Sequence, residues 1–275
     1  MTRRTEPLLW AGVVIVGAVG LVAVLAPVLA PYDPRAPSGP SLIAPGGAHL
    51  LGTNDAGQDI LSQLIWGART SSVVAVVSAT LVVLVGTLVG AASGLAGGAA
   101  DRLTMRMVDV FLAVPALPLL ILVAALAGAG RATVILVIAL AGWPHVARIV
   151  RSQALSLGRR GYVDAARGFG AGRWYVIRRH LLPALSPLVA ASLVSWAATA
   201  VVLQAGLAFL GLSDPTEVSW GSILNRAQAH EGVYFGAQWT WWVLPPGLAI
   251  TVSAMGLAFI GVGLEPRANP RWGRA

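Results

Sequence analysis

The stretch that decides the fold runs from Arg148 to Pro187 and reads RIVRSQALSLGRRGYVDAARGFGAGRWYVIRRHLLPALSP. It is the longest polar interruption between two apolar runs. Four of its residues are spaced at i, i+3, i+4 and i+7, which puts them on one face of a helix: Tyr162, Ala165, Ala166 and Phe169. Small alanines allow another chain to come close, and aromatic side chains commonly anchor protein interfaces. The stretch therefore predicts a short helix that inserts into a groove of a second protein.

The composition of the whole chain is that of an integral membrane protein. Of its 275 residues, 56% are hydrophobic and 11% are charged, whereas a soluble domain has about 25% charged residues. The absence of cysteine excludes disulfides and cysteine-ligated metal sites. The net charge of +8 comes from arginines that gather in particular loops. Their distribution indicates a membrane orientation and no nucleic-acid partner.

Six apolar runs are each long enough to cross a bilayer, which takes roughly 20 residues of helix. We place them at residues 8–30, 71–98, 108–128, 131–147, 186–210 and 241–263. The first run follows Arg3 and Arg4 as the core of a secretory signal would. It exceeds the roughly 7–15 apolar residues of such a core, so we expect it to be retained as a helix. The expected fold class is an all-α membrane protein with six transmembrane helices.

The arginines divide unevenly between the two sides of these spans. With the N-terminus in the cytoplasm, fifteen arginines lie on the cytoplasmic side, eight of them in the stretch 148–187, and four lie outside. Short loops rich in Lys and Arg remain in the cytoplasm. We therefore expect a multi-pass protein of the cytoplasmic membrane, with both termini and the long loop inside.

Several residues within the spans indicate how the helices pack. The second span has glycines at every fourth position, which make a flat stripe for close contact with another helix: Gly86, Gly90 and Gly94. Pro115 and Pro118 are expected to bend the third span. Asp109, near the start of that span, is expected to pair with an arginine or to cap its helix.

Each of the two outer segments contains an amphipathic stretch. In residues 31–70, we expect Thr53, Asn54 or Asp55 to cap a helix that rests on the membrane interface. Its apolar face comprises Ile60, Leu61, Leu64 and Ile65. In residues 211–240, a second stretch begins at Ser219. Its apolar face comprises Trp220, Ile223, Leu224 and Ala227.

The spacing of the central stretch resembles the EAA loop of permease subunits of ATP-binding-cassette importers. That pattern runs acid-Ala-Ala, three residues, Gly, nine residues, an aliphatic residue, one residue and Leu-Pro. The matching positions are Asp164, Ala165, Ala166, Gly170, Leu182 and Pro183. His180 takes the aliphatic place, and this form resembles the branch that imports peptides and nickel.

Other stretches resemble the same branch in the same order, so that the likeness covers about residues 7–272. They are LGTNDAGQD at 51–59, FLGLSDPTEVSWGSIL at 209–224 and WWVLPPGLAI at 241–250. The chain departs from the branch at Asn54 and Gln58, at Gln204, where a glutamate is usual, and in residues 256–265.

The resemblance implies a fold, a set of partners and a set of coupling residues. The fold would be the permease fold, with residues 1–70 forming the first helix and an extracytoplasmic segment, and residues 71–270 forming the permease core with the coupling loop 148–187. The partners would be a homologous permease, two ATPase subunits or domains, an extracytoplasmic substrate-binding protein and membrane lipid. ATP and Mg would bind to the ATPases, so this chain would need no cofactor. The coupling residues would be Tyr162, Asp164, Ala165, Ala166, Phe169, Gly170, Leu182 and Pro183.

The function implied is that of the second permease of a dipeptide or oligopeptide importer, with nickel or another small solute as the alternative cargo. A stand-alone channel or carrier usually holds ionisable residues in mid-membrane, whereas the cores of these six runs contain no Arg, Asp or Glu. An intramembrane hydrolase would need a nucleophile, a base or a metal set.

No sign of such chemistry is found in the sequence. The chain has no lysine for a phosphate-binding P-loop, and neither His-Glu-x-x-His nor Gly-x-Ser-x-Gly occurs. The four histidines are not at ligand spacing, so we expect them to be structural hydrogen-bonding groups: His49, His145, His180 and His230. The sequence therefore predicts a non-catalytic transport subunit.

The orientation can be tested with reporter fusions. We expect reporters placed after Ala99 and Gly158 to be cytoplasmic and a reporter placed near Gly47 to be external, because fifteen of the nineteen arginines then lie inside. Alkaline phosphatase and green fluorescent protein fusions at the three sites would measure this. A cytoplasmic signal at Gly47 would contradict the orientation.

Overall fold

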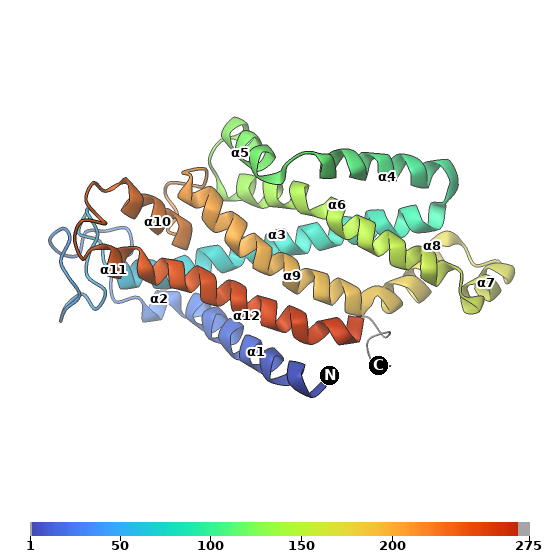
Figure 1. Cartoon of the computed structure of the whole chain (residues 1–275), viewed down its shortest axis with the longest axis horizontal. Helices are drawn as coiled ribbons and strands as arrows, with labels where there is room; N and C mark the ends of the chain where they lie inside the picture. The colour runs from blue at the N-terminus through green and yellow to red at the C-terminus, as the bar shows by residue number, and fades with distance from the viewer. Residues whose placement is uncertain (1, 269–275) are drawn as a thin grey trace.

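The computed structural model describes residues 2–268, and within them it contains α-helices, one π-helix and two isolated β-bridges (Figure 1). The elements in chain order are α1 Thr2–Val24, α2 Ala26–Leu29, α3 Ile60–Ala96, α4 Gly98–Ala113, α5 Ala116–Ala127, α6 Arg131–Gly158, α7 Gly161–Gly168, α8 Arg173–Val176, the π-helix η1 Ile177–Leu181, α9 Leu182–Phe209, α10 Trp220–Ala229, α11 Trp239–Trp242 and α12 Leu244–Ala268.

Six crossings of the membrane are available in this structure. Five helical stretches are long and apolar enough to span: Glu6–Val24, Ile60–Ala96, Arg131–Gly158, Trp174–Phe209 and Trp239–Leu264. Helices α4 and α5 are together long and apolar enough to make a sixth crossing if they are counted as one broken span, with an angle of 87° between them. The break lies at Pro115, which has no N–H to continue the hydrogen bonds of α4. The bend expected from the prolines is therefore confirmed.

The two ends of the bundle carry different segments (Figure 1). We call the end with residues 31–59 and 211–238 the outer end, and the end with residues 159–181 the inner end. The start of α1 and the end of α12 lie near each other, away from the outer segments. This arrangement agrees with an even number of crossings.

Helix α3 begins at Ile60, well before the expected span at residue 71. The amphipathic stretch expected on the membrane interface is instead the first part of α3, because nothing interrupts the helix between the two. Its cap is Asp59, whose Oδ2 accepts a hydrogen bond from the Ser62 amide at 2.7 Å. The expected caps, Thr53, Asn54 or Asp55, lie in the preceding loop. Ile60 is fully buried under that loop, and the boundary placed at residue 70 falls inside α3.

Helices α3 and α6 lie in close contact through the glycines of α3. A Cβ atom added to Gly90 would lie 2.4 Å from the carbonyl oxygen of Ala147, and one added to Gly86 would lie 2.6 Å from the Cβ atom of Val146. Gly94 meets the next turns of α6 in the same way. These distances leave no room for a side chain, so the two backbones are in contact along this face.

Helix α1 packs antiparallel to α12 through a second set of glycines. A Cβ atom on Gly12 would lie 2.5 Å from the carbonyl oxygen of Gly256, and one on Gly256 would lie 2.6 Å from Cγ2 of Ile15. Helix α12 also contacts α9, which contacts α3. The chain thus forms one helical bundle, in which α1 packs against α12 along its length and against the core through Ala23.

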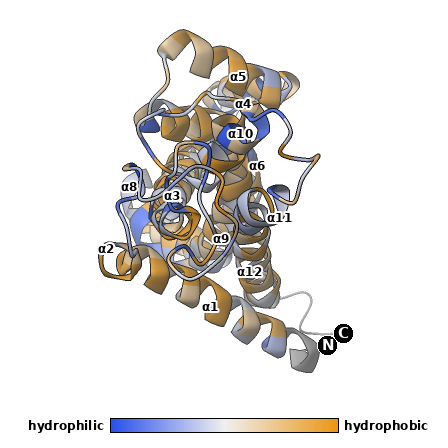
Figure 2. Cartoon of the chain, turned by 90° about the vertical axis from the view of Figure 1, so that its left-hand side faces the viewer, coloured by the Kyte–Doolittle hydropathy of each residue, from blue (hydrophilic) through white to orange (hydrophobic). Residues whose placement is uncertain are grey.

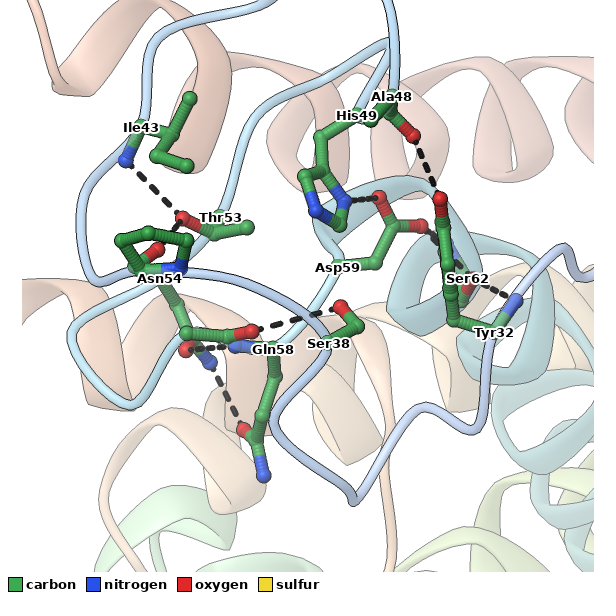
Figure 3. A network of polar contacts seen from close by, with 12 residues as sticks. Tyr32, Ser38, Ile43, Ala48, His49, Thr53, Asn54, Gln58, Asp59 and Ser62 are labelled. Atoms are coloured by element: carbon green, nitrogen blue, oxygen red, sulfur yellow. Dashed lines mark hydrogen bonds and ion pairs between the residues drawn. The ribbon is translucent and has the colours of Figure 1, made fainter.

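The outer segment between α2 and α3 is held by buried polar side chains (Figure 3). Nδ1 of His49 lies 2.9 Å from Oδ1 of Asp59, and both side chains are buried. The other carboxylate oxygen of Asp59 accepts from the hydroxyl of Ser62 at 2.7 Å, so a single carboxylate joins the loop to α3. The centroids of the Tyr32 and His49 rings lie 4.9 Å apart, and the hydroxyl of Tyr32 donates to the carbonyl of Ala48. The expected structural role of His49 is confirmed.

Helix α10 closes the outer end above α3. It begins after Ser219, where the amphipathic stretch was expected to start, and Ser219 caps it in a capping box with Ser222. Trp220 and Ala227 are buried on its inner face. The indole Nε1 of Trp220 donates to the carbonyl of Leu64 at 3.0 Å, which connects α10 to the first turns of α3.

The outside of the bundle is apolar, whereas polar residues gather in the loops at the outer end (Figure 2). Large apolar side chains are exposed along the helices, among them Leu21, Val76, Leu84, Leu126 and Leu248. A soluble monomer rarely exposes so extensive an apolar surface. These faces are suited to lipid and to contact with other membrane helices.

The contact between α3 and α6 generates a prediction about Gly90. We expect Gly90→Leu to reduce the yield of folded subunit or to block its assembly, because the new side chain would collide with the backbone of α6. Overpacking of this kind costs about 1–3 kcal/mol or more. The measurement is the amount of subunit that elutes as a monodisperse species in detergent.

Gly17→Leu is the matched control, because a Cβ atom there meets nothing within 4 Å. It introduces the same side chain into another membrane helix. If Gly90→Leu yields as much folded protein as Gly17→Leu, the close contact between α3 and α6 is not required.

Candidate functional site

The candidate site is the loop between α6 and α9 at the inner end, where α7 lies beyond the ends of the long helices (Figure 1). Helix α6 ends at Gly158, and after two residues α7 begins at Gly161. The chain then returns through α8 and η1 into α9. The short helix expected from the sequence is therefore present, and it is attached to a long membrane helix on each side.

The apolar side chain of Val163 anchors α7 to the bundle. Val163 is fully buried in a cluster that includes Leu157 of α6, Val176 of α8 and Leu181 of η1. Its amide also donates to the carbonyl of Arg160 at 2.8 Å. The position of α7 thus depends on packing against both ends of the loop.

The opposite side of α7 is open to solvent. The side chain of Ala165 is exposed, and that of Ala166 is half-buried. Phe169, just past the helix, is 94% exposed, and Tyr162 is 44% exposed. The side chain of Asp164 lies outside what the structure describes. A large aromatic group that is almost fully exposed beside small alanines is typical of a contact surface.

Helix α7 ends in a turn that requires glycine. Gly170 has φ of +82°, in the left-handed region that side chains disfavour. The amide of Ala171 donates to the carbonyl of Ala166 at 3.0 Å. This hydrogen bond joins residues five positions apart along the chain, as in a Schellman cap. The glycine at this place in the spacing pattern therefore ends the helix and directs the chain towards α8.

The return path into α9 passes through a π-helix. The amide of Leu182 donates to the carbonyl of Ile177, a bond that spans five residues. Pro183 follows directly after η1 in the first turn of α9, and because it has no N–H it cannot donate to a carbonyl of the preceding turn. The ring of His180, in η1, lies 5.7 Å from that of Tyr162 and 5.8 Å from that of Tyr175. His180 thus packs between two tyrosines.

Two ion pairs hold α4 against α6 beside this loop. Arg151 donates to Asp101 through both Nε, at 2.5 Å, and Nη2, at 2.6 Å. The hydroxyl of Ser93, at the end of α3, donates to the same carboxylate at 2.6 Å. Arg148 pairs with Asp109, as expected for that aspartate. The pair at Asp101 was not predicted, since fifty positions separate it from Arg151 and only the fold brings them together.

The site offers an exposed surface formed by α7 and the turn after it. Within residues 2–268, the described His, Asp and Glu side chains form no group of three that could hold a metal ion. The functional features are an exposed helix, a glycine turn and the ion pairs that attach the loop's flanking helices to their neighbours.

Comparison with known proteins places these features in a family. Residues 86–274 match the family described as binding-protein-dependent transport system inner membrane component. A putative peptide permease protein of Brucella suis biovar 1 is 38% identical over 229 residues, covering 83% of this chain and 75% of that protein. The probable D,D-dipeptide transport system permease protein of Escherichia coli K12 is 33% identical over 273 residues, covering 98% and 90%.

A solved structure supports the same fold. The protein described as the MetNI methionine ABC transporter in inward-facing conformations aligns with a TM-score of 0.56 and 20% identity. The alignment covers 73% of this chain and 96% of that one. With the family match over most of the chain and relatives above 30% identity along nearly its whole length, the chain belongs to the family of binding-protein-dependent transport system inner membrane components.

Proposed function

We propose that this chain is the permease subunit of an ATP-driven importer of peptides and that α7 is its contact with the ATPases. The observation that carries the proposal is the exposed surface of α7, with Phe169 and Ala165 open to solvent at the tip of a loop between two membrane helices. The peptide cargo is supported by relatives named as peptide and D,D-dipeptide permeases.

The proposed assembly has two permeases, two ATPase subunits or domains and an extracytoplasmic substrate-binding protein. In it, the inner end with both termini faces the cytoplasm, as the arginine distribution favours. Helix α7 occupies a groove on an ATPase, with Tyr162 and Phe169 as aromatic anchors. ATP and Mg bind to the ATPases, and this chain contributes the path and the helix that is moved.

A displacement of α7 would pass into the membrane through its attachments. Val163 fixes α7 to the inner apolar cluster. Arg151, on the helix that leads into α7, holds Asp101 at the start of α4. Helix α6 therefore moves together with α4, up to the break at Pro115. Such a chain of packed and hydrogen-bonded groups can carry ATP-driven motion towards the path.

The coupling role of α7 predicts the phenotype of two substitutions. We expect Ala165→Trp to leave the subunit in the membrane and to abolish both transport and substrate-stimulated ATP hydrolysis, because the added volume would overpack the contact with the ATPase. Gly170→Val should act in the same way by straining the left-handed turn, at about 1–2 kcal/mol. The measurement is ATP hydrolysis by the complex in nanodiscs, with and without loaded binding protein.

Ala99→Trp is the matched control, since Ala99 is also exposed at the inner end but lies outside the loop. It should retain stimulation, as should Arg159→Gln, whose charge we expect to serve orientation. Full stimulation of the Ala165→Trp complex would show that α7 is not the coupling contact.

The cargo is tested separately by uptake. Proteoliposomes that contain the whole complex and its binding protein should accumulate a labelled peptide in an ATP-dependent manner. Accumulation of nickel or another small solute in place of any peptide would leave the permease assignment standing and would contradict the peptide cargo.

A further inference from the structure

A cleft of about 570 Å³, lined by both polar and apolar side chains, opens at the outer end of the bundle, the end that faces the viewer in Figure 2. One wall comes from the outer segment before α3, with Arg35 and Gln58. The other wall comes from the connection between α9 and α10, with Ser213 and Asp214, and from Arg226 of α10. Segments far apart in the sequence therefore meet around one space.

Most of the charged groups around the cleft are already paired. Arg226 donates to Asp55 at 2.6 Å and to Gln58 at 2.9 Å. Glu217 accepts two hydrogen bonds from Arg131, at 2.7 and 2.9 Å. These contacts connect the two walls to each other and to the start of α6. The charged side chains that form them are therefore already neutralised by a partner.

Two opposite charges on the walls remain available. The guanidinium of Arg35 forms no hydrogen bond or ion pair with any described side chain, and Arg35 is exposed. Asp214 uses Oδ1 to accept from the amide and the hydroxyl of Thr216, at 2.8 and 2.6 Å. Its Oδ2 has no partner among residues 2–268. These hydrogen bonds from Thr216, together with the positive charges of Arg131 and Arg35, lower the pKa of Asp214, so the carboxylate is ionised at neutral pH.

A buried amide lies beneath the cleft. A small cavity shares Ser213, Asp214 and Glu217 with the cleft and is also lined by Gln204. Gln204 is 2% exposed, and its Oε1 has no hydrogen-bond partner in the described structure. A buried acceptor without a partner is destabilising, so a donor that reaches it would be favoured. The Arg131–Glu217 pair lines the same cavity, and Glu217 also lines the cleft.

We propose that this cleft binds the substrate itself as a zwitterion, with Arg35 contacting the carboxylate of a short peptide and Asp214 contacting its ammonium group. Gln204 would then accept a hydrogen bond from a peptide N–H once the Arg131–Glu217 pair separates. The inference rests on the proposed import of peptides and names the residues that receive the cargo in this subunit. A short peptide with free termini supplies one cation, one anion and amide donors, which are the three complements that the cleft lacks.

The chain offers a sensitive way to detect occupancy, because it has no native cysteine. A single cysteine introduced as Ser213→Cys would lie in the cleft, and one introduced as Ser41→Cys would be exposed on the outer segment outside it. The complete complex with its binding protein is treated with a methanethiosulfonate reagent, and the rate of labelling of this subunit is followed. The probes are trialanine and N-acetyl-trialanine amide, which lacks both terminal charges.

We expect saturating trialanine to slow the labelling of Ser213→Cys by about threefold or more and to leave Ser41→Cys unchanged, while the blocked peptide protects neither. Arg35→Gln or Asp214→Asn should remove the protection and should lower uptake of trialanine by roughly threefold below saturation, the size expected for one partly solvated ionic contact. Glu231→Gln, which removes an exposed outer acid away from the cleft, should leave uptake unchanged.

The outcomes separate this inference from the proposed function. If the unsubstituted complex takes up no peptide, the peptide cargo itself is wrong. If it takes up trialanine but Arg35→Gln and Asp214→Asn behave as Glu231→Gln does, the cleft does not bind the substrate. Equal protection of Ser213→Cys by the binding protein without peptide would identify the cleft as a binding-protein contact and would also overturn the inference.

Discussion

The contact between the backbones of α3 and α6 is the constraint on which the rest of the subunit depends. At Gly90 there is no space for even one methyl group before the carbonyl of Ala147. Interiors packed at this density do not deform smoothly, so two helices joined in this way move as one unit. Helix α3 supports the outer segment through Asp59, and α6 leads into α7. The outer end and the loop between α6 and α9 are therefore built on one rigid pair of helices.

Electrostatic contacts extend this pair at the inner end. Arg151 lies on the face of α6 that contacts Gly90. Its guanidinium donates two hydrogen bonds, from Nε and Nη2, to the carboxylate of Asp101. Ser93 donates to the same carboxylate, so three helices meet at a single acid. Beyond this point α4 and α5 meet at an angle of 87° at Pro115, and Leu120 of α5 is buried in the same core cluster as Val134 and Ile138 of α6. The subunit thus joins α3, α4 and α6 at the inner end through one carboxylate and holds α5 by apolar packing.

The sequence predicts much of this arrangement, because the physical signals are local. Apolar runs identify the six spans, Pro115 identifies the bend, and the glycine spacing identifies one face of α3. What it does not predict depends on contacts between distant segments. Asp59 caps α3 in place of the expected Thr53, Asn54 or Asp55, since the outer segment folds back over that turn and supplies His49 as a partner. The glycines that join α1 to α12 lie on different helices, so no single stretch shows a stripe.

Helix α3 is longer than a bilayer crossing requires. Its 37 residues rise about 55 Å at 1.5 Å per residue, whereas the hydrocarbon layer is about 30 Å thick. The helix is therefore longer than the hydrocarbon layer is thick, and it runs without a break from Ile60, buried under the outer segment, to the inner end of the bundle. In the assembly proposed above, a displacement of its outer cap would be carried along this one continuous helix towards the side of the ATPases. Damage to the hydrogen bonds of Asp59 would then appear as a signalling defect on the opposite face of the membrane.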